Sequence, residues 1–218
     1  MQQWVRRGGG YSRNKRAGMM RFDDDDDDDD GRKTNTNTNK SGCSTSSCAE
    51  LLVYDFDGTL ANTPTPREGK IMYENKIGQA WPHVGWWGRQ ESLEPPLEVG
   101  PGPAWASYVE NRTRTDCVRI MMTGRVEKLS RRVTECLRML EGATETLCFH
   151  ELVFKKGNGD TLEYKCEELR RMVRAYGPKK VRIWEDRVKH AEGFREFGKR
   201  EFAEIVFEVT LVEPSNDY

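Results

Sequence analysis

The sequence contains no long apolar run, no pair of closely spaced cysteines and almost no net charge. Its longest apolar runs, such as Leu51 to Tyr54, have the length of a strand, whereas a membrane span requires roughly 18 apolar residues. The sequence therefore predicts a soluble protein with no membrane partner.

The six cysteines form no Cys-x-x-Cys pair, which argues against a zinc site. The last four lie within apolar patterns, where cysteine commonly packs as a small hydrophobic residue. These features favour a reducing intracellular compartment, the cytoplasm or the nucleus. The cysteines are Cys43, Cys48, Cys117, Cys136, Cys148 and Cys166.

The charge balance, 35 basic against 36 acidic residues, argues against a purely electrostatic nucleic-acid binder. Residues 1–48 combine a basic arm with the acidic run Asp23 to Asp30 and a Thr/Asn/Ser-rich stretch. Because this composition cannot offset the entropy cost of ordering, we expect a disordered tail over 1–48. The basic arm is also typical of a mitochondrial presequence, so mitochondrial import is an alternative, although Gly8 to Gly10 would break the required helix.

From residue 49 onward, apolar runs of strand length alternate with helical patterns. Strands are predicted over Glu50 to Asp55, Val118 to Met122, within Thr146 to Phe154, over Val181 to Trp184 and over Ala203 to Val212. Helices are predicted over Val126 to Leu140, about Thr161 to Tyr176, and from Val188 to Phe197 as a short helix. This alternation favours a mainly parallel sheet in a three-layer α/β/α domain over 49–218. Residues 61–117 form an irregular insertion that could cap a site.

Polar side chains follow the predicted strands at their carboxyl ends, the edge where parallel α/β sheets bind ligands. The first strand leads into Asp55 and Asp57, and the second into Thr123, Gly124 and Arg125. Further groups are Lys165, early in the helix after the third strand, and Glu185, Asp186 and Arg187 after the fourth.

Four carboxylates at one edge require a cation, and an all-oxygen cluster favours Mg²⁺. The predicted magnesium ligands are Asp55, Asp57, Asp186 and, through water, Glu185. Magnesium in turn suggests a phosphorylated substrate. Asp55 is the expected nucleophile and would form an aspartyl-phosphate, while Asp57 would act as general acid and base. Thr123 would donate a hydrogen bond to the phosphoryl group, and Lys165 would supply positive charge.

In this order, the chain resembles the four motifs of the haloacid dehalogenase (HAD) superfamily: the first over Asp55 to Leu60, the second over Ile120 to Arg125, the third at Lys165 and the fourth over Trp184 to Arg187. The segments Gly85-Trp86-Trp87, Thr161 to Lys165 and Glu185 to His190 are similar to the subgroup called Swiss Army Knife RNA repair-like HAD domains. The resemblance implies a Rossmann-like fold and magnesium-dependent phosphohydrolase chemistry, with RNA or nucleotide end phosphates as candidate substrates. The Thr-Gly-Arg motif also resembles polynucleotide 3′-phosphatases, which implies that Gly124 and Arg125 hold the phosphate and that Arg187 supports the site.

Several alternatives are open at this stage. Lys155 and Lys156 compete with Lys165 for the third motif, although loop lysines are usually solvated. His190 is expected to be structural. The insertion is rich in tryptophan, whose rings could stack nucleobases or form an anchoring hydrophobic cluster. Its arginines Arg89, Arg112 and Arg114 could meet a phosphate backbone. A small-molecule phosphatase and an inactive assembly factor of an RNA–protein particle are the rival functions. The tryptophans are Trp81, Trp86, Trp87 and Trp105.

Overall fold

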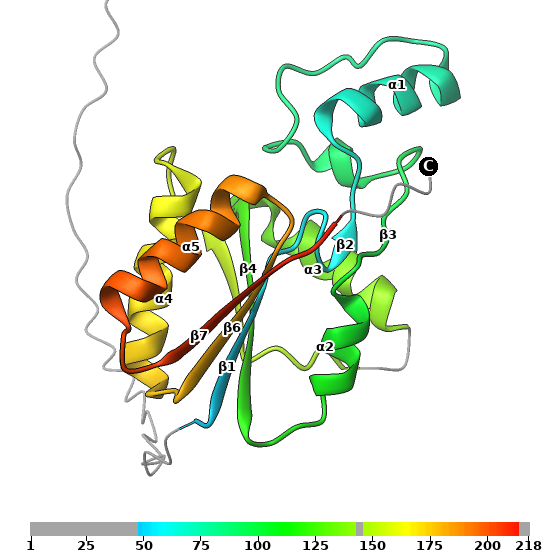
Figure 1. The fold of residues 1–218 in the computed structure, drawn as a ribbon. Helices are drawn as coiled ribbons and strands as arrows, with labels where there is room; N and C mark the ends of the chain where they lie inside the picture. The colour runs from blue at the N-terminus through cyan, green and yellow to red at the C-terminus, as the bar shows by residue number, and fades with distance from the viewer. Residues whose placement is uncertain (1–47, 143–145, 214–218) are drawn as a thin grey trace, which may run out of the picture. The chain divides into compact units, whose positions relative to one another are not determined.

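The computed structural model describes residues 48–142 and 146–213. The predicted disordered tail therefore lies outside the described residues, except for Cys48 (Figure 1). None of the described helices is long and apolar enough to cross a membrane.

A sheet of five strands runs through the described domain (Figure 1). The spatial order is β5-β4-β1-β6-β7, and every neighbouring pair is parallel. This confirms the predicted sheet, and the chain turns from one side of β1 to the other, which creates the switch point where such folds bind ligands. The strands are β1 (Glu50–Tyr54), β4 (Cys117–Val126), β5 (Glu151–Lys155), β6 (Lys180–Glu185) and β7 (Val206–Leu211).

The burial of the strands matches their positions in the sheet. All five residues of β1 are buried, as expected for a central strand covered on both faces. By contrast, β7 is a partly exposed edge strand whose residues alternate between exposed and half-buried positions over most of its length.

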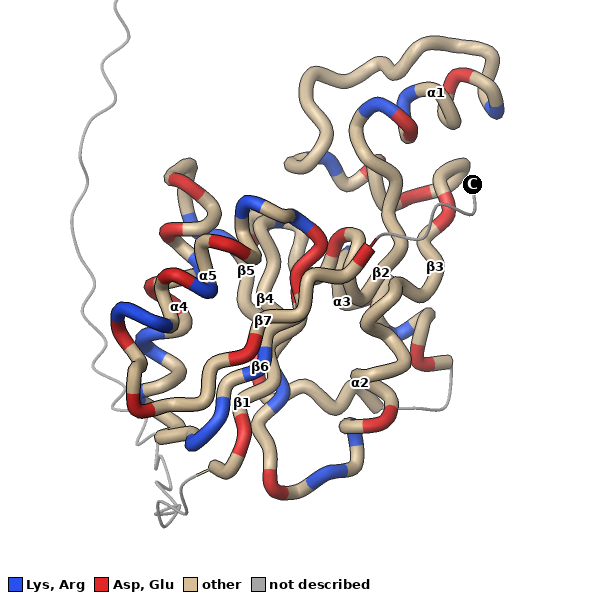
Figure 2. Tube along the Cα trace, viewed as in Figure 1, with Lys and Arg blue, Asp and Glu red and all other residues tan. Residues whose placement is uncertain are grey.

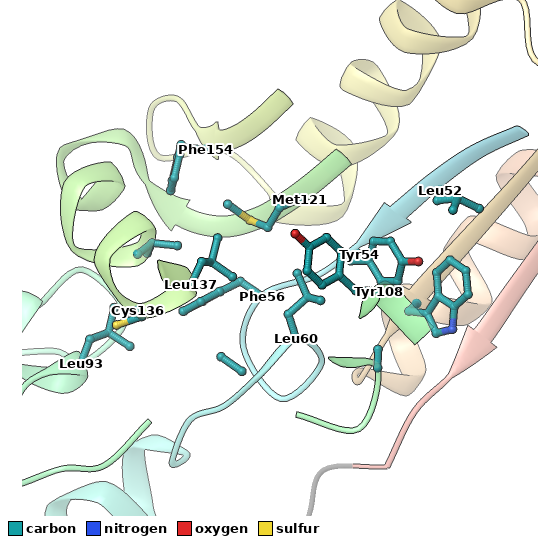
Figure 3. Close-up of a cluster of buried hydrophobic side chains, with 14 of the residues drawn as sticks. Leu52, Tyr54, Phe56, Leu60, Leu93, Tyr108, Met121, Cys136, Leu137 and Phe154 are labelled. Atoms are coloured by element: carbon teal, nitrogen blue, oxygen red, sulfur yellow. The ribbon is translucent and has the colours of Figure 1, made fainter. Parts of the chain in front are cut away.

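Helices cover both faces of the sheet, which confirms the three layers (Figure 1). On one face, α4 (Thr161–Tyr176) and α5 (Val188–Glu201) pack on a cluster containing Leu51 and Ile183. On the other face, α2 (Trp105–Asn111) and α3 (Ser130–Glu141), which follows the short 3₁₀ helix η2 (Glu127–Leu129), pack on a cluster centred on Tyr54 and Phe56 (Figure 3). The predicted short helix after β6 is longer than expected, at 14 residues.

The boundaries of α4 follow from its sequence. The side chain of Asp160 accepts a hydrogen bond from the Glu163 amide at 3.0 Å, and Gly177 ends the helix in the left-handed conformation. Lys165 occupies a buried position on the face that also carries Leu169 and Met172. A lysine on an apolar helix face must find a charged partner there.

The insertion is more regular than the sequence predicted. It contains β2 (Ala61–Asn62) paired antiparallel with β3 (Gly100–Pro101), the helix α1 (Pro66–Ile77), the 3₁₀ helix η1 (Gln90–Leu93) and α2. Thr65 and Glu68 form a reciprocal capping box at the start of α1, a local signal that explains why this helix forms.

Most insertion tryptophans anchor the segment, which confirms the hydrophobic-cluster interpretation for them. Trp86 is buried and packs beside Trp81, with ring centres 4.8 Å apart. A Cβ atom at Gly69 would lie only 2.0 Å from the Trp86 ring, so α1 needs glycine there to approach it. Trp105 packs on Tyr108 in the core.

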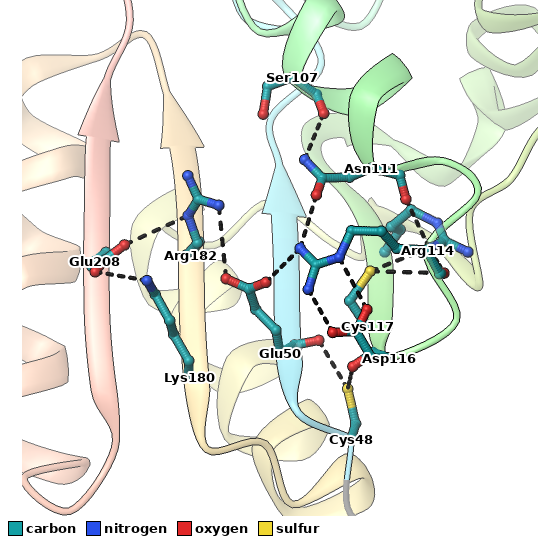
Figure 4. Close-up of polar contacts among 11 residues, drawn as sticks. Cys48, Glu50, Ser107, Asn111, Arg114, Asp116, Cys117, Lys180, Arg182 and Glu208 are labelled. Carbon is teal, nitrogen blue, oxygen red and sulfur yellow. Dashed lines mark hydrogen bonds and ion pairs between the residues drawn. The ribbon is translucent and has the colours of Figure 1, made fainter.

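The insertion arginines are engaged elsewhere and do not meet the predicted site. Arg114 pairs with Glu50 at 2.7 Å, at the amino ends of the strands and opposite the site (Figure 4). Arg112 pairs with Glu141, and Arg89 donates to the Val84 carbonyl. The longer helices α1, α3, α4 and α5 each carry both basic and acidic residues (Figure 2).

Candidate functional site

A pocket of about 280 Å³ lies at the carboxyl ends of β1, β4 and β6. Six predicted site residues line it: Asp55, Asp57, Gly124, Arg125, Lys165 and Arg187. These side chains lie close together because the strands of a parallel sheet all end at the same edge.

Asp55 continues β1 by one residue, since its amide donates to the Trp184 carbonyl of β6 at 3.0 Å. The chain then turns tightly through Gly58, which has a positive φ of 65°. A Cβ atom at Gly58 would lie 2.5 Å from Asp186 Oδ2. Glycine therefore serves both the turn and the close approach of the first and fourth motifs.

Of the three candidate lysines, Lys165 is the one that pairs with Asp55. Its Nζ lies 2.9 Å from Asp55 Oδ1 and 2.8 Å from Glu185 Oε2, and the side chain is almost completely buried. Lys156 is exposed on the loop after β5, as expected for a solvated lysine. Lys155, in contrast, lines the pocket and donates to Thr161 Oγ1 at 3.0 Å.

The carboxylates at the pocket floor titrate abnormally. Burial and the neighbouring Glu185 raise the pKa of Asp55 well above its usual range, although Lys165 opposes the shift. Burial and Glu185 likewise raise the pKa of Asp186 to about 7. Burial also acts to raise the pKa of Glu185, but Lys165 and His190 outweigh it and hold that pKa low.

Asp55, Glu185 and Asp186 form a cluster fit for a divalent cation. One carboxylate oxygen from each lies within 4.8 Å of the others. Asp186 Oδ1 is buried without a hydrogen-bond partner in the described part of the chain, which indicates a place for a ligand. Lys165 neutralises one of the three charges, and a divalent ion would balance the remaining two.

Glu185 is less available as a direct metal ligand than the two aspartates. Its Oε2 is held by Lys165, and its Oε1 accepts the Arg187 amide at 3.3 Å and lies 3.4 Å from His190 Nδ1. This arrangement leaves Asp55 and Asp186 as the better direct ligands.

Asp57 differs from the expectation that its carboxylate belongs with the metal ligands. It is not part of the acidic cluster, because Arg125 and Thr63 hold it instead. Thr63 Oγ1 donates to Asp57 Oδ1 at 2.8 Å, and Arg125 Nη2 donates to the same oxygen at 2.8 Å. The carboxylate still lines the pocket, as a general acid must.

The Thr-Gly-Arg motif lies on an irregularity of β4. β4 runs beyond Met122, where the predicted strand ended, to Val126. Its register with β5 shifts between Thr123 and Val126, and such an irregularity bends the strand at the motif. Thr123 is buried and is not among the residues that line the pocket; its Oγ1 accepts the Arg125 amide at 3.0 Å. Gly124 forms the pocket wall at this point.

Eight further residues line the pocket, and three of them, Trp87, Lys155 and His190, were not among the predicted catalytic or binding residues. Trp87 comes from the insertion, and its ring centre lies 5.0 Å from the Arg125 guanidinium carbon and 5.4 Å from that of Arg187. The sequence hinted at this place for Trp87 through the family-like Gly-Trp-Trp segment and through the expectation that tryptophan rings of the insertion could stack nucleobases.

The pocket cations fall into two classes. Lys165 and Arg125 are committed to buried ion pairs with Asp55 and Asp57. Arg187 and Lys155 form no ion pair with a described acidic residue, and α4 and α5 begin beside them. The positive ends of two helices and two available cations make this side of the pocket suitable for an anion.

The family comparison gives a match over residues 76–218 to "HAD domain family 1 in Swiss Army Knife RNA repair proteins". The chain belongs to this family. The match confirms the resemblance and includes the second, third and fourth motifs. Asp55 and Asp57 precede the matched range, so their place in the site rests on the geometry described above.

Relatives of this HAD-family chain are distant. An uncharacterised protein of Saccharomyces cerevisiae is 26% identical over an alignment of 170 positions, and the match covers 68% of this chain and 36% of that protein. The chain thus spans about a third of the length of this relative.

Solved structures were also found. The HAD domain of an effector protein from Legionella pneumophila has a TM-score of 0.45 and 10% identity, over 77% of this chain and 87% of that one. A Thermotoga maritima protein described as a β-phosphoglucomutase has a TM-score of 0.44 and 18% identity, over 76% and 94%.

Proposed function

We propose that this HAD-family chain is a metal-dependent phosphomonoesterase that acts through an Asp55 phospho-intermediate. The observation that carries the proposal is the buried group at the pocket floor: Asp55 lies beside Lys165 and within a cluster of carboxylates that fits one divalent cation. Structural ion pairs rarely need a third carboxylate with an unpartnered buried oxygen.

The residues divide the reaction into two steps. A carboxylate oxygen of Asp55 attacks phosphorus while the bond to the leaving oxygen breaks, and Asp57 gives its proton to that oxygen. Asp57 then takes a proton from water, which attacks the same phosphorus, releases phosphate and regenerates Asp55. Lys165, at 2.9 Å from Asp55 Oδ1, favours the ionised form of Asp55 and orients its carboxylate.

Mg²⁺ is the proposed cofactor, held by Asp55 and Asp186, with Glu185 behind them. When bound, the ion supplies positive charge against the phosphoryl oxygens. Asp55 and Asp186, with their raised pKa values, would then be held in the ionised form.

The proposed substrate is a terminal phosphate on an RNA or nucleotide. The pocket volume of about 280 Å³ lies just under the roughly 300–1,000 Å³ of sites that enclose a whole small ligand. It therefore suits an end phosphate and its nearest atoms, with the rest of the substrate outside. Arg187 and Lys155 are the cations available to it, and the family name places related domains in RNA repair proteins.

The test compares phosphate release from a chromogenic ester and from 3′- and 5′-phosphorylated RNA, with Mg²⁺ and with chelator. We expect release that requires the metal and is abolished in Asp55→Asn, because an amide cannot form the acyl phosphate. The matched control is Asp116→Asn at the opposite end of the sheet, which should keep its activity. Full activity of Asp55→Asn would overturn the mechanism. Inactivity on every substrate with RNA still bound would instead favour an assembly factor.

A further inference from the structure

The side chain of Arg125 is completely enclosed, with 0% exposure. Its Nε donates to Asp57 Oδ2 at 3.0 Å and lies 3.2 Å from Oδ1, and its Nη2 donates to Oδ1 at 2.8 Å. Its Nη1 donates to the Trp87 carbonyl at 3.1 Å and to Ser92 Oγ at 2.6 Å.

These contacts leave little of Arg125 for a phosphate group. A guanidinium has five N–H donors, and four of them already have protein acceptors in this arrangement. The Trp87 ring in addition lies against the guanidinium. A residue that gripped substrate would need a free pair of donors on one edge.

The insertion residues that hold Arg125 are themselves fixed. Ser92 is fully buried in η1, and its hydroxyl donates to the Arg89 carbonyl at 2.7 Å. The next residue, Leu93, is buried in the core, and its carbonyl accepts Arg132 Nε of α3 at 3.0 Å. Arg125 thus connects Asp57 to a rigid part of the insertion.

We infer that Arg125 is a positioning residue: it holds the Asp57 carboxylate in the orientation for proton transfer and makes that orientation depend on the seated insertion. This inference rests on the proposed phosphomonoesterase function. Oδ1 accepts from both Thr63 and Arg125, whereas Oδ2 accepts from Arg125 Nε alone among the residues that the structure describes. Oδ2 is therefore the oxygen that carries the proton to the leaving group.

The test exploits the leaving group. The leaving group of an alkyl phosphate is an alkoxide, which needs a proton from Asp57. The leaving group of p-nitrophenyl phosphate is p-nitrophenolate, which departs without a proton. In Arg125→Lys, a single ammonium cannot satisfy Asp57, the Trp87 carbonyl and Ser92 together. We expect kcat/KM for an alkyl phosphate to fall about 100-fold, the lower range of general acid catalysis, and for p-nitrophenyl phosphate by less than about threefold. Because kcat/KM covers steps only up to the phospho-enzyme, hydrolysis of the intermediate does not obscure the result.

Arg119→Lys is the matched control. Arg119 is also buried on β4, but it donates to the Cys148, Asn111 and Arg114 carbonyls away from the pocket. Its replacement should lower the thermal stability without changing the ratio of kcat/KM between the two esters. Ser92→Ala offers a milder version of the test, since it removes one support of Arg125 and should shift the ratio in the same direction.

Inhibition by inorganic phosphate provides a second measurement. If Arg125 only positions Asp57, the inhibition constant of Arg125→Lys should stay within about twofold of that of the wild type. A rise above tenfold, or an equal loss of kcat/KM on both esters in folded protein, would overturn the inference and make Arg125 a phosphate ligand. Wild-type protein inactive on both esters would instead overturn the proposed function.

Discussion

Lys165→Met tests whether the pocket floor is held by charge. Lys165 Nζ lies 2.9 Å from Asp55 and 2.8 Å from Glu185, and the side chains of all three are at most 7% exposed. Methionine keeps the length and the apolar stem but leaves two buried carboxylates without their cation. Loss of one partner of a buried ion pair costs about 3–5 kcal/mol. For a domain of this size that corresponds to a fall in Tm of about 6–20 °C.

The loss should depend on pH with a definite sign. The pKa of Asp55 is already raised by burial and by Glu185, and removal of Lys165 raises it further. A carboxyl group with a raised pKa binds its proton more tightly in the folded than in the unfolded chain. The deficit is therefore complete above the folded-state pKa and shrinks as the pH falls through it, which a series from about pH 8 to about pH 5 would detect.

The assay is thermal unfolding of the wild type and the variant, with chelator and with Mg²⁺. We expect Mg²⁺ to recover part of the deficit, because a divalent ion would replace the lost positive charge. Lys155→Met is the control, since Lys155 lines the same pocket without an acidic partner among the described residues; it should change the stability by less than about 0.5 kcal/mol. A Lys165→Met protein that unfolds within about 2 °C of the wild type in chelator, where about 6 °C or more is expected, would refute the argument.

Three further predictions follow from the same structure. Gly69→Ala places a methyl group against Trp86, so urea unfolding should show that the free energy of unfolding falls by about 1–3 kcal/mol. Gly88→Ala is the control, since the space around its Cβ position is open, and it should change little. Equal losses in the two variants would contradict the clash. Arg187→Gln and Lys155→Gln should raise the KM for phosphorylated RNA about tenfold each, with smaller effects on kcat, because they remove binding charge; an unchanged KM would place the phosphate elsewhere. Mg²⁺ at about 100 times its Kd should stabilise the protein by about 2.7 kcal/mol, whereas Asp186→Asn should lose most of that gain; stabilisation that survived the substitution would exclude the acidic cluster as the site.

The fold was largely predictable because the positions of its strands and helices follow from local patterns of apolar residues. Apolar runs predicted the strands, and the stripe of α4, with Gly177 after it, predicted that helix almost to the residue. The insertion was predicted less well. Its helix α1 is mostly exposed and depends on the capping box at Thr65 and on a contact between Gly69 and Trp86, neither of which produces an apolar periodicity.

The candidate site divides in the same way. The order of the motifs along the chain predicted that carboxylates and a lysine would meet, because the carboxyl ends of parallel strands share one edge of the sheet. It did not predict that Asp57 would lie outside the acidic cluster. The position of Lys165 at the start of a predicted helix also favoured it over the loop lysines Lys155 and Lys156. The sequence could not show that Arg125 is paired with Asp57 or that Arg114 pairs with Glu50 at the opposite end of the sheet. It also could not show that Trp87 and Lys155 line the pocket. Those outcomes depend on which groups compete for each charge in the packed interior, and that competition exists only once segments distant in the sequence have come together.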